Sequence, residues 1–63
     1  MDHKLRTMEE AAADLRVPLA TLRFWRHQGI GPRGFKVGRR VMFTEAEIDR
    51  WLREQASKSV LLG

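Results

Sequence analysis

The 63-residue sequence contains no cysteine, and this absence excludes both disulfide bonds and metal sites built from thiolates. Its two histidines, His3 and His27, are too few and too far apart to indicate a zinc site. No apolar run approaches the roughly 20 residues that a membrane-spanning helix needs, and no apolar segment follows the first residues as it would in a signal peptide. We therefore expect a cytoplasmic protein with no cofactor, no small-molecule ligand and no membrane partner.

The short length argues against an enzyme. A chain of 63 residues forms one domain at most, and it buries only about 60% of the surface that its unfolded form exposes. Such a domain has little room for a concave substrate pocket, and the sequence contains no cysteine nucleophile and no recognisable base triad. We therefore predict a binding domain without enzymatic activity.

The most informative absence is that of acidic residues from the middle of the chain. The net charge is +4, and no aspartate or glutamate occurs between Leu15 and Thr44. The cations of this interval are Arg16, Arg23, Arg26, Arg33, Lys36, Arg39 and Arg40. Because a solvated protein surface normally mixes both signs, a block of one sign inside a domain indicates a polyanionic partner.

Two helices joined by a short turn are predicted in the N-terminal half. Thr7 and Glu10 match a capping box, and the apolar residues at helical spacing behind them predict a helix over residues 8–15. Arg16-Val17-Pro18 interrupts this helix, because the residue before a proline avoids the helical conformation. A second helix is expected from Pro18 or Leu19 to Gln28, and Gly29 follows as a C-terminal stop. This pattern is typical of a helix-turn-helix.

A β-hairpin is predicted next, because residues 35–37 and 41–43 are rich in β-branched and aromatic residues. Two registers fit these strands. A three-residue loop over residues 38–40 pairs Val37 with Val41 and Phe35 with Phe43. A two-residue loop beginning at Gly38 agrees better with turn chemistry. We favour the three-residue loop, because burial of four apolar side chains outweighs a turn preference, and in both registers Arg39 lies at the tip.

A third helix and two tails complete the predicted fold. Thr44 and Glu47 match a second capping box, and the apolar spacing behind them predicts a helix that ends near Gln55. Residues 1–6 and 56–63 are expected to be flexible tails, and the final "SVLLG" is either frayed or a contact to a neighbouring protomer. The sequence thus predicts a small α+β fold, a winged helix-turn-helix over residues 7–55. Its expected core is Met8, Ala12, Leu15, Leu22, Trp25, Val37, Val41, Phe43, Ile48, Trp51 and Leu52.

Several short motifs make the chain resemble the excisionase and AlpA-like winged helix-turn-helix family. They are "EEAA" in the first helix, "V-x-x-x-TLR-x-W" in the second, then "G-x-GP", "VG-R" and the final "WL". The resemblance covers about 50 of the 63 residues, and it extends to the DNA-binding head of MerR-type regulators. One departure is Arg16-Val17-Pro18, where the family usually has Gly-Val-Ser. Pro18 has no side-chain oxygen to cap the second helix, and Arg16 is expected in the left-handed conformation that glycine prefers.

The resemblance implies binding to double-stranded DNA, with the second helix in the major groove and the hairpin wing in the adjacent minor groove. The residues that it places in or near the major groove are Leu19, Ala20, Thr21, Arg23, Phe24, Arg26 and His27. It places Gly38, Arg39 and Arg40 on the wing. Arg23 and Arg26 are candidates for guanine or for phosphate contacts.

Excisionases of this family bind DNA cooperatively in the bacterial cell, bend it, and steer a tyrosine or serine integrase toward excision. AlpA-like and MerR-like relatives regulate transcription instead, and the residues leave both roles open. The resemblance therefore implies an integrase and neighbouring protomers as further partners. RNA binding is disfavoured because most aromatic residues fit the core, and a pure protein-interaction module does not need the acid-free interval.

Overall fold

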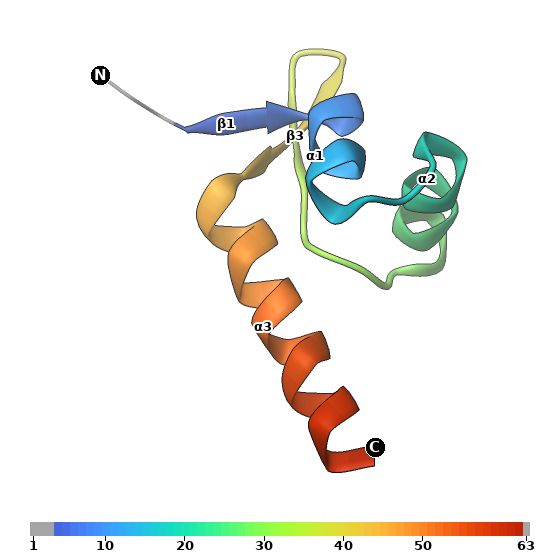
Figure 1. Cartoon of the computed structure of the whole chain (residues 1–63). Helices are drawn as coiled ribbons and strands as arrows, with labels where there is room; N and C mark the ends of the chain where they lie inside the picture. The colour runs from blue at the N-terminus through green and yellow to red at the C-terminus, as the bar shows by residue number, and fades with distance from the viewer. Residues whose placement is uncertain (1–3, 63) are drawn as a thin grey trace.

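The computed structural model describes the backbone of residues 4–62 and the side chains of residues 4–59. The fold consists of three helices and a three-stranded antiparallel sheet, and the strands are interspersed with the helices along the chain (Figure 1). The elements are β1 (Leu5–Thr7), α1 (Met8–Leu15), α2 (Leu19–Gln28), β2 (Phe35–Val37), β3 (Arg40–Thr44) and α3 (Glu45–Leu62). This arrangement confirms the predicted winged helix-turn-helix.

The helix-turn-helix follows the local signals of the sequence. The capping box of α1 forms as predicted, since Thr7 Oγ1 accepts from the Glu10 N–H at 3.1 Å and Glu10 Oε1 accepts from the Thr7 N–H at 2.9 Å. Arg16 takes the left-handed conformation with φ 58°, and Pro18 begins α2 without a side-chain cap. Gly29, with φ 77°, closes α2. These four local predictions are confirmed.

The sheet contains one strand more than the sequence predicts. Its order is β1-β3-β2, and β1 pairs antiparallel with β3 so that Leu5 lies opposite Thr44 and Arg6 opposite Phe43. The prediction of a tail over residues 1–6 is therefore wrong for Leu5 and Arg6, while residues 1–3 lie outside the described residues. A three-residue strand has too few positions for a recognisable alternation of apolar and polar side chains.

Arg6 ties this added strand to two helices. Its guanidinium lies 3.2 Å from Asp14 of α1 and 2.7 Å from Glu45 of α3, measured between the charged nitrogen and oxygen atoms. All three side chains are partly exposed, so each pair contributes modestly, on the order of 1 kcal/mol or less. The contacts fix β1 against the ends of the helices that flank it.

The hairpin adopts the two-residue loop, and the register that we favoured is wrong. Val37 pairs with Arg40 and Phe35 with Met42, while Gly38 takes φ 63°, as the two-residue hairpin turns require at their first position. Phe35 and Val37 consequently point away from the core and are 44% and 51% exposed.

Gly34 supplies the physical reason for this register. A Cβ at Gly34 would lie 2.8 Å from Cε2 of Phe43 and 3.0 Å from Cγ1 of Val41. The ring of Phe43 therefore occupies the space opposite a glycine, where the three-residue loop would have required Phe35. Turn chemistry and this close approach together outweigh the burial that we had expected to decide the register.

The core lies where α1, α2, the start of α3 and the inner face of the sheet meet. Its buried side chains are Ala11, Ala12, Leu22, Phe43 and Ile48, and the side chains packed against them are Met8, Leu15, Val17, Leu19, Trp25 and Val41. Val37 and Leu52 were predicted to be buried and are exposed, Val37 because of the register. Leu52 is 39% exposed and lines an open hollow together with Ile48 and Asp49.

Helix α3 does not end near Gln55, as the sequence suggested, but continues to Leu62. No glycine or proline interrupts it, and ion pairs one helical turn apart support its exposed side. Asp49 pairs with Arg53 at 2.9 Å and Glu54 with Lys58 at 3.5 Å. Residues 56–62 are therefore helical rather than a loose tail, and Gly63 lies outside the described residues.

Glu47 joins α3 to the loop before the wing. Half of the predicted second capping box forms, since Thr44 Oγ1 accepts from the Glu47 N–H at 3.1 Å. The Glu47 carboxylate instead accepts hydrogen bonds from the Arg33 backbone N–H at 2.9 Å and from the Arg50 guanidinium at 2.6 and 2.9 Å. The hydrogen bonds from Arg50, then the one from the Arg33 backbone, lower the pKa of Glu47 to about 2.

We predict that Glu47→Gln reduces the loss of folding stability that accompanies a fall in pH. Because the folded state holds the pKa of Glu47 at about 2, below the ordinary 4.5, the ionised carboxylate stabilises the fold fully above about pH 4.5. That contribution is lost as the pH falls through this window toward 2. Urea denaturation at pH 7 and at pH 3 should show a variant that is less stable at pH 7, by roughly 1 kcal/mol, and that loses less stability on acidification.

Glu9→Gln is the matched control, because it removes a carboxylate that has no ion-pair partner among the described residues. If the free energy of unfolding changes with pH by the same amount in Glu47→Gln and in Glu9→Gln, the Glu47 contacts do not stabilise the fold.

Candidate nucleic-acid interface

One side of α2 carries a continuous exposed stripe. Its members recur at helical spacing and are Ala20, Arg23, Phe24, His27 and Gln28. Leu22, on the opposite side, is 1% exposed and holds the helix on the core. Phe24 is 60% exposed, so a large aromatic ring faces solvent beside two basic side chains. The stripe thus presents a guanidinium, an aromatic ring, an imidazole, an amide and one small residue to a ligand that lies against it.

Three residues that the resemblance placed near the major groove lie beside this stripe rather than on it. Leu19 packs against the core, and Thr21 is partly buried with its N–H bonded to the Pro18 carbonyl at 3.0 Å. Arg26 is also partly buried, and its Nη1 lies 3.5 Å from the Gly34 carbonyl. The structure thus brings four of the seven predicted helix residues together on the exposed stripe.

The wing stands next to this helix. Gly38 and Arg39 form the turn between β2 and β3, and both they and Arg40 are exposed. A groove of about 330 Å³ runs between the wing and α2, and Arg23, Arg39 and Arg40 all line it. Arg23 also lines an adjoining open hollow with Arg26 and His27. The basic residues of α2 and of the wing therefore form one continuous surface, which we call the basic groove.

The cations of the basic groove form no ion pair with an acid among the described residues. Every ion pair among the described side chains belongs to Arg6, Arg50, Arg53 or Lys58, apart from an interaction of Lys4. The carboxylates of Asp14, Glu45, Glu47, Asp49 and Glu54 are held in those pairs. The tertiary structure thus neutralises the cations at the two ends of the chain and leaves those of the middle available.

Sequence reasoning missed four residues of the groove. Met8 and Val41 line both of its parts, and Thr7 and Glu9 line it beside the arginines. Glu9 stands at the exposed start of α1, where a negative charge is favourable to the helix dipole. Its position in the first turn was visible in the sequence, but its nearness to the wing depends on the packing of α1 against β3.

The described residues contain no group of three or more acidic or histidine side chains placed to hold a metal ion. No helix in this part of the chain is long and apolar enough to cross a membrane.

A family model described as a helix-turn-helix domain matches residues 7–56. The family contains excisionase and AlpA-like proteins, so the match confirms the resemblance inferred from the motifs. No curated protein and no solved structure matches the chain at a significant level.

We predict that the arginines of the basic groove contribute little to folding. Replacing Arg23, Arg39 and Arg40 together with alanine should change the free energy of unfolding by less than about 1 kcal/mol, because none of them forms an ion pair. Relief of repulsion between like charges offsets part of the packing that is lost. Urea denaturation measures this difference.

Arg6→Ala is the comparison, since it breaks the pairs with Asp14 and Glu45 and should cost more than the triple substitution. A triple variant that unfolds instead would assign these arginines a structural role.

Proposed function

Because this chain belongs to the helix-turn-helix domain family, we propose that it binds duplex DNA through the basic groove. In this arrangement α2 enters the major groove and the wing reaches the adjacent minor groove. The observation that carries the proposal is the continuity of Arg23 on α2 with Arg39 and Arg40 on the wing. Cations without carboxylate partners are free to replace the counterions of a phosphate backbone.

The residues of the exposed stripe of α2 support different kinds of contact in the major groove. Arg23 is long enough to form a bidentate contact to guanine O6 and N7, worth about 1–3 kcal/mol of discrimination. Phe24 offers an apolar ring to a thymine methyl or to sugar. Ala20 allows close approach near the start of the helix, whereas His27 and the partly buried Arg26 are placed for phosphate.

The wing supports a different kind of contact. Arg39 lies at the apex of a two-residue turn with its side chain exposed, and a narrow A·T-rich minor groove has an enhanced negative potential that attracts arginine. Arg40 is the first residue of β3 and also lines the basic groove, so it is placed for the phosphates at the groove rim. In this proposal Arg39 reads groove width and Arg40 positions the wing.

The specific role that we propose is that of an excisionase, which bends DNA and steers an integrase toward excision, with protomers bound side by side. The support for it is membership of a family that includes excisionases, together with the exposed arginines of the wing, which we propose enter a minor groove. Minor-groove contacts of this kind commonly accompany bending. Transcriptional regulation, the activity of other members, is the competing outcome of the tests.

We predict a steep salt dependence of binding to duplex DNA. Roughly five to seven phosphate contacts should give a log–log slope of about −4 to −6, measured by fluorescence anisotropy between 50 and 200 mM salt. Arg39→Ala should weaken binding several-fold and reduce the slope by about 1, without lowering the melting temperature. A flat slope, or no duplex binding at 50 mM salt, would contradict the proposal.

Arg53→Ala is the matched control for Arg39→Ala. It removes one exposed arginine from α3, outside the basic groove, and should leave both affinity and slope close to those of the unchanged protein.

The excisionase role predicts stimulation of recombination. An integrase encoded beside this chain should excise its element faster when the protein is added, and a fluorescence-transfer assay on end-labelled DNA should report bending. Arg39→Ala should reduce both effects together. Duplex binding and repression of a neighbouring promoter without any stimulation of excision would assign the regulatory role instead.

A further inference from the structure

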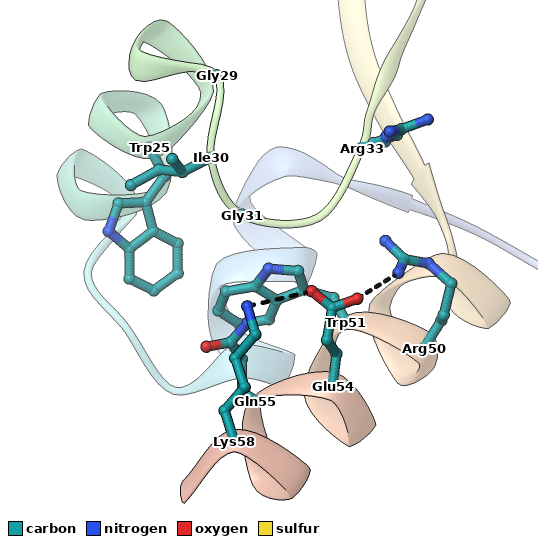
Figure 2. A pocket seen from close by; sticks show the side chains of 10 residues that line it. All are labelled: Trp25, Gly29, Ile30, Gly31, Arg33, Arg50, Trp51, Glu54, Gln55 and Lys58. Carbon is teal, nitrogen blue, oxygen red and sulfur yellow. Dashed lines mark hydrogen bonds and ion pairs between the residues drawn. The ribbon is translucent and has the colours of Figure 1, made fainter. Parts of the chain in front are cut away.

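A second hollow lies away from the basic groove, between α3 and the loop that follows α2 (Figure 2). It has a volume of about 560 Å³, and we call it the tryptophan cleft, because both tryptophans of the chain line it. No residue of the exposed stripe of α2 and no residue of the wing turn borders it. A ligand in this cleft would leave the basic groove free.

The lining of the tryptophan cleft is mixed, with an apolar part formed by the two tryptophans and Ile30 and a polar part formed by charged side chains and Gln55. The rings of Trp25 and Trp51 meet at 5.3 Å between centroids and 44° between planes, yet both side chains remain partly exposed. Ile30 lies beside them and is 54% exposed. One exposed and two partly exposed large apolar side chains therefore meet at one place in the cleft, where they can contact an apolar side chain of a ligand.

The loop side of the cleft is fixed before any ligand arrives. The Ile30 N–H donates to the Trp25 carbonyl at 2.8 Å, and Gly31, with φ 81°, lies so close to Trp25 that a Cβ there would stand 3.3 Å from the side chain. Farther along the loop, the Arg33 N–H is held by Glu47. A preformed wall reduces the ordering entropy that binding has to overcome.

Positive charge stands at both ends of the cleft. In Figure 2 Arg33 lies at one end and Lys58 at the other, with Trp51 between them. The guanidinium of Arg33 lies beyond ion-pair distance of the described carboxylates, although its charge contributes to the lowered pKa of Glu47 and its backbone N–H donates to that carboxylate. Lys58 shares the carboxylate of Glu54 with Arg50, at 3.5 and 2.9 Å respectively. The longer and more exposed pair of Lys58 exchanges for an incoming carboxylate at little cost.

We propose that the tryptophan cleft binds an acidic peptide segment of a protein partner. A bulky apolar side chain of that segment packs against the two indoles and Ile30, and carboxylates on either side of it pair with Arg33 and Lys58. Apolar anchors in a fixed pocket carry most of the affinity of such a contact, while the flanking cations select the charge of the partner. The domain then holds DNA on one surface and a protein on another.

The test uses the full chain and a short synthetic peptide with Leu-Phe-Leu at its centre, aspartates and glutamates at its ends, and no tryptophan. Because the chain has two tryptophans and both line the cleft, the two indole N–H resonances in a ¹⁵N correlation spectrum report its occupancy directly. The acidic peptide should shift both resonances with saturation. An analogue with lysines at its ends should not, and an analogue with alanines at its centre should bind far more weakly.

Two variants with the same change of charge on the same helix locate the contact. Lys58→Glu should weaken peptide binding about fivefold or more, whereas Arg53→Glu, outside the cleft, should stay within about twofold of the unchanged protein. Ile30→Ser removes the apolar wall and should weaken binding as well. Melting temperatures confirm that each variant is folded.

Three results would overturn the proposal. They are the absence of a saturable indole shift with the acidic peptide, equal binding of the lysine analogue, and equal losses in Lys58→Glu and Arg53→Glu.

Duplex DNA is titrated separately. Indole shifts caused by DNA and abolished by Lys58→Glu would assign the cleft to the DNA surface and also contradict the proposal. Failure of DNA binding alone leaves the peptide result intact, so the two proposals are tested independently.

Discussion

The inward position of Phe43 is the constraint on which the rest of the fold depends. Its side chain is completely buried in the central strand, between β1 and β2. Since side chains alternate along a strand, burial of Phe43 also turns Val41 inward and sends Met42 and Arg40 to the other face. Close contact of its ring with Gly34 sets the position of β2, and the tip of the wing follows from that position. A packing requirement thus decides where two arginines point.

The separation between cations that pair with acids and cations that do not follows from the same architecture. β1 crosses beside β3 and brings Arg6 to carboxylates on α1 and α3, while the remaining acids of α3 pair within that helix. Apart from the pairs of Arg6, the acids of α3 are therefore paired with cations one helical turn away in the sequence. The arginines of α2 and of the wing share a surface with one carboxylate, Glu9, and form no ion pair with it. In our proposal, DNA binding and stability depend on different cations of this small domain.

Glu47 links the two surfaces that we propose for binding. Its carboxylate holds the backbone at Arg33, on the loop that leads from α2 to the wing and also borders the tryptophan cleft. The loop itself lines the tryptophan cleft, while the basic groove is lined by the helix before the loop and the wing after it. Anchoring of the loop by Glu47 therefore bears on both surfaces, although no residue of the loop lines the basic groove.

Local chemistry made much of the structure readable from the sequence. The capping box at Thr7, the break at Pro18 and the stop at Gly29 depend on neighbouring residues, and they bound α1 and α2 as predicted. The acid-free interval was equally visible, because it needs no knowledge of contacts. Only the tertiary structure decided that β1 exists, that Gly34 rather than Phe35 faces Phe43, and that Arg23 stands beside Arg39 and Arg40. Those features depend on hydrogen bonds and packing between residues far apart in the chain. The free energies of such contacts cannot be predicted from a local sequence pattern.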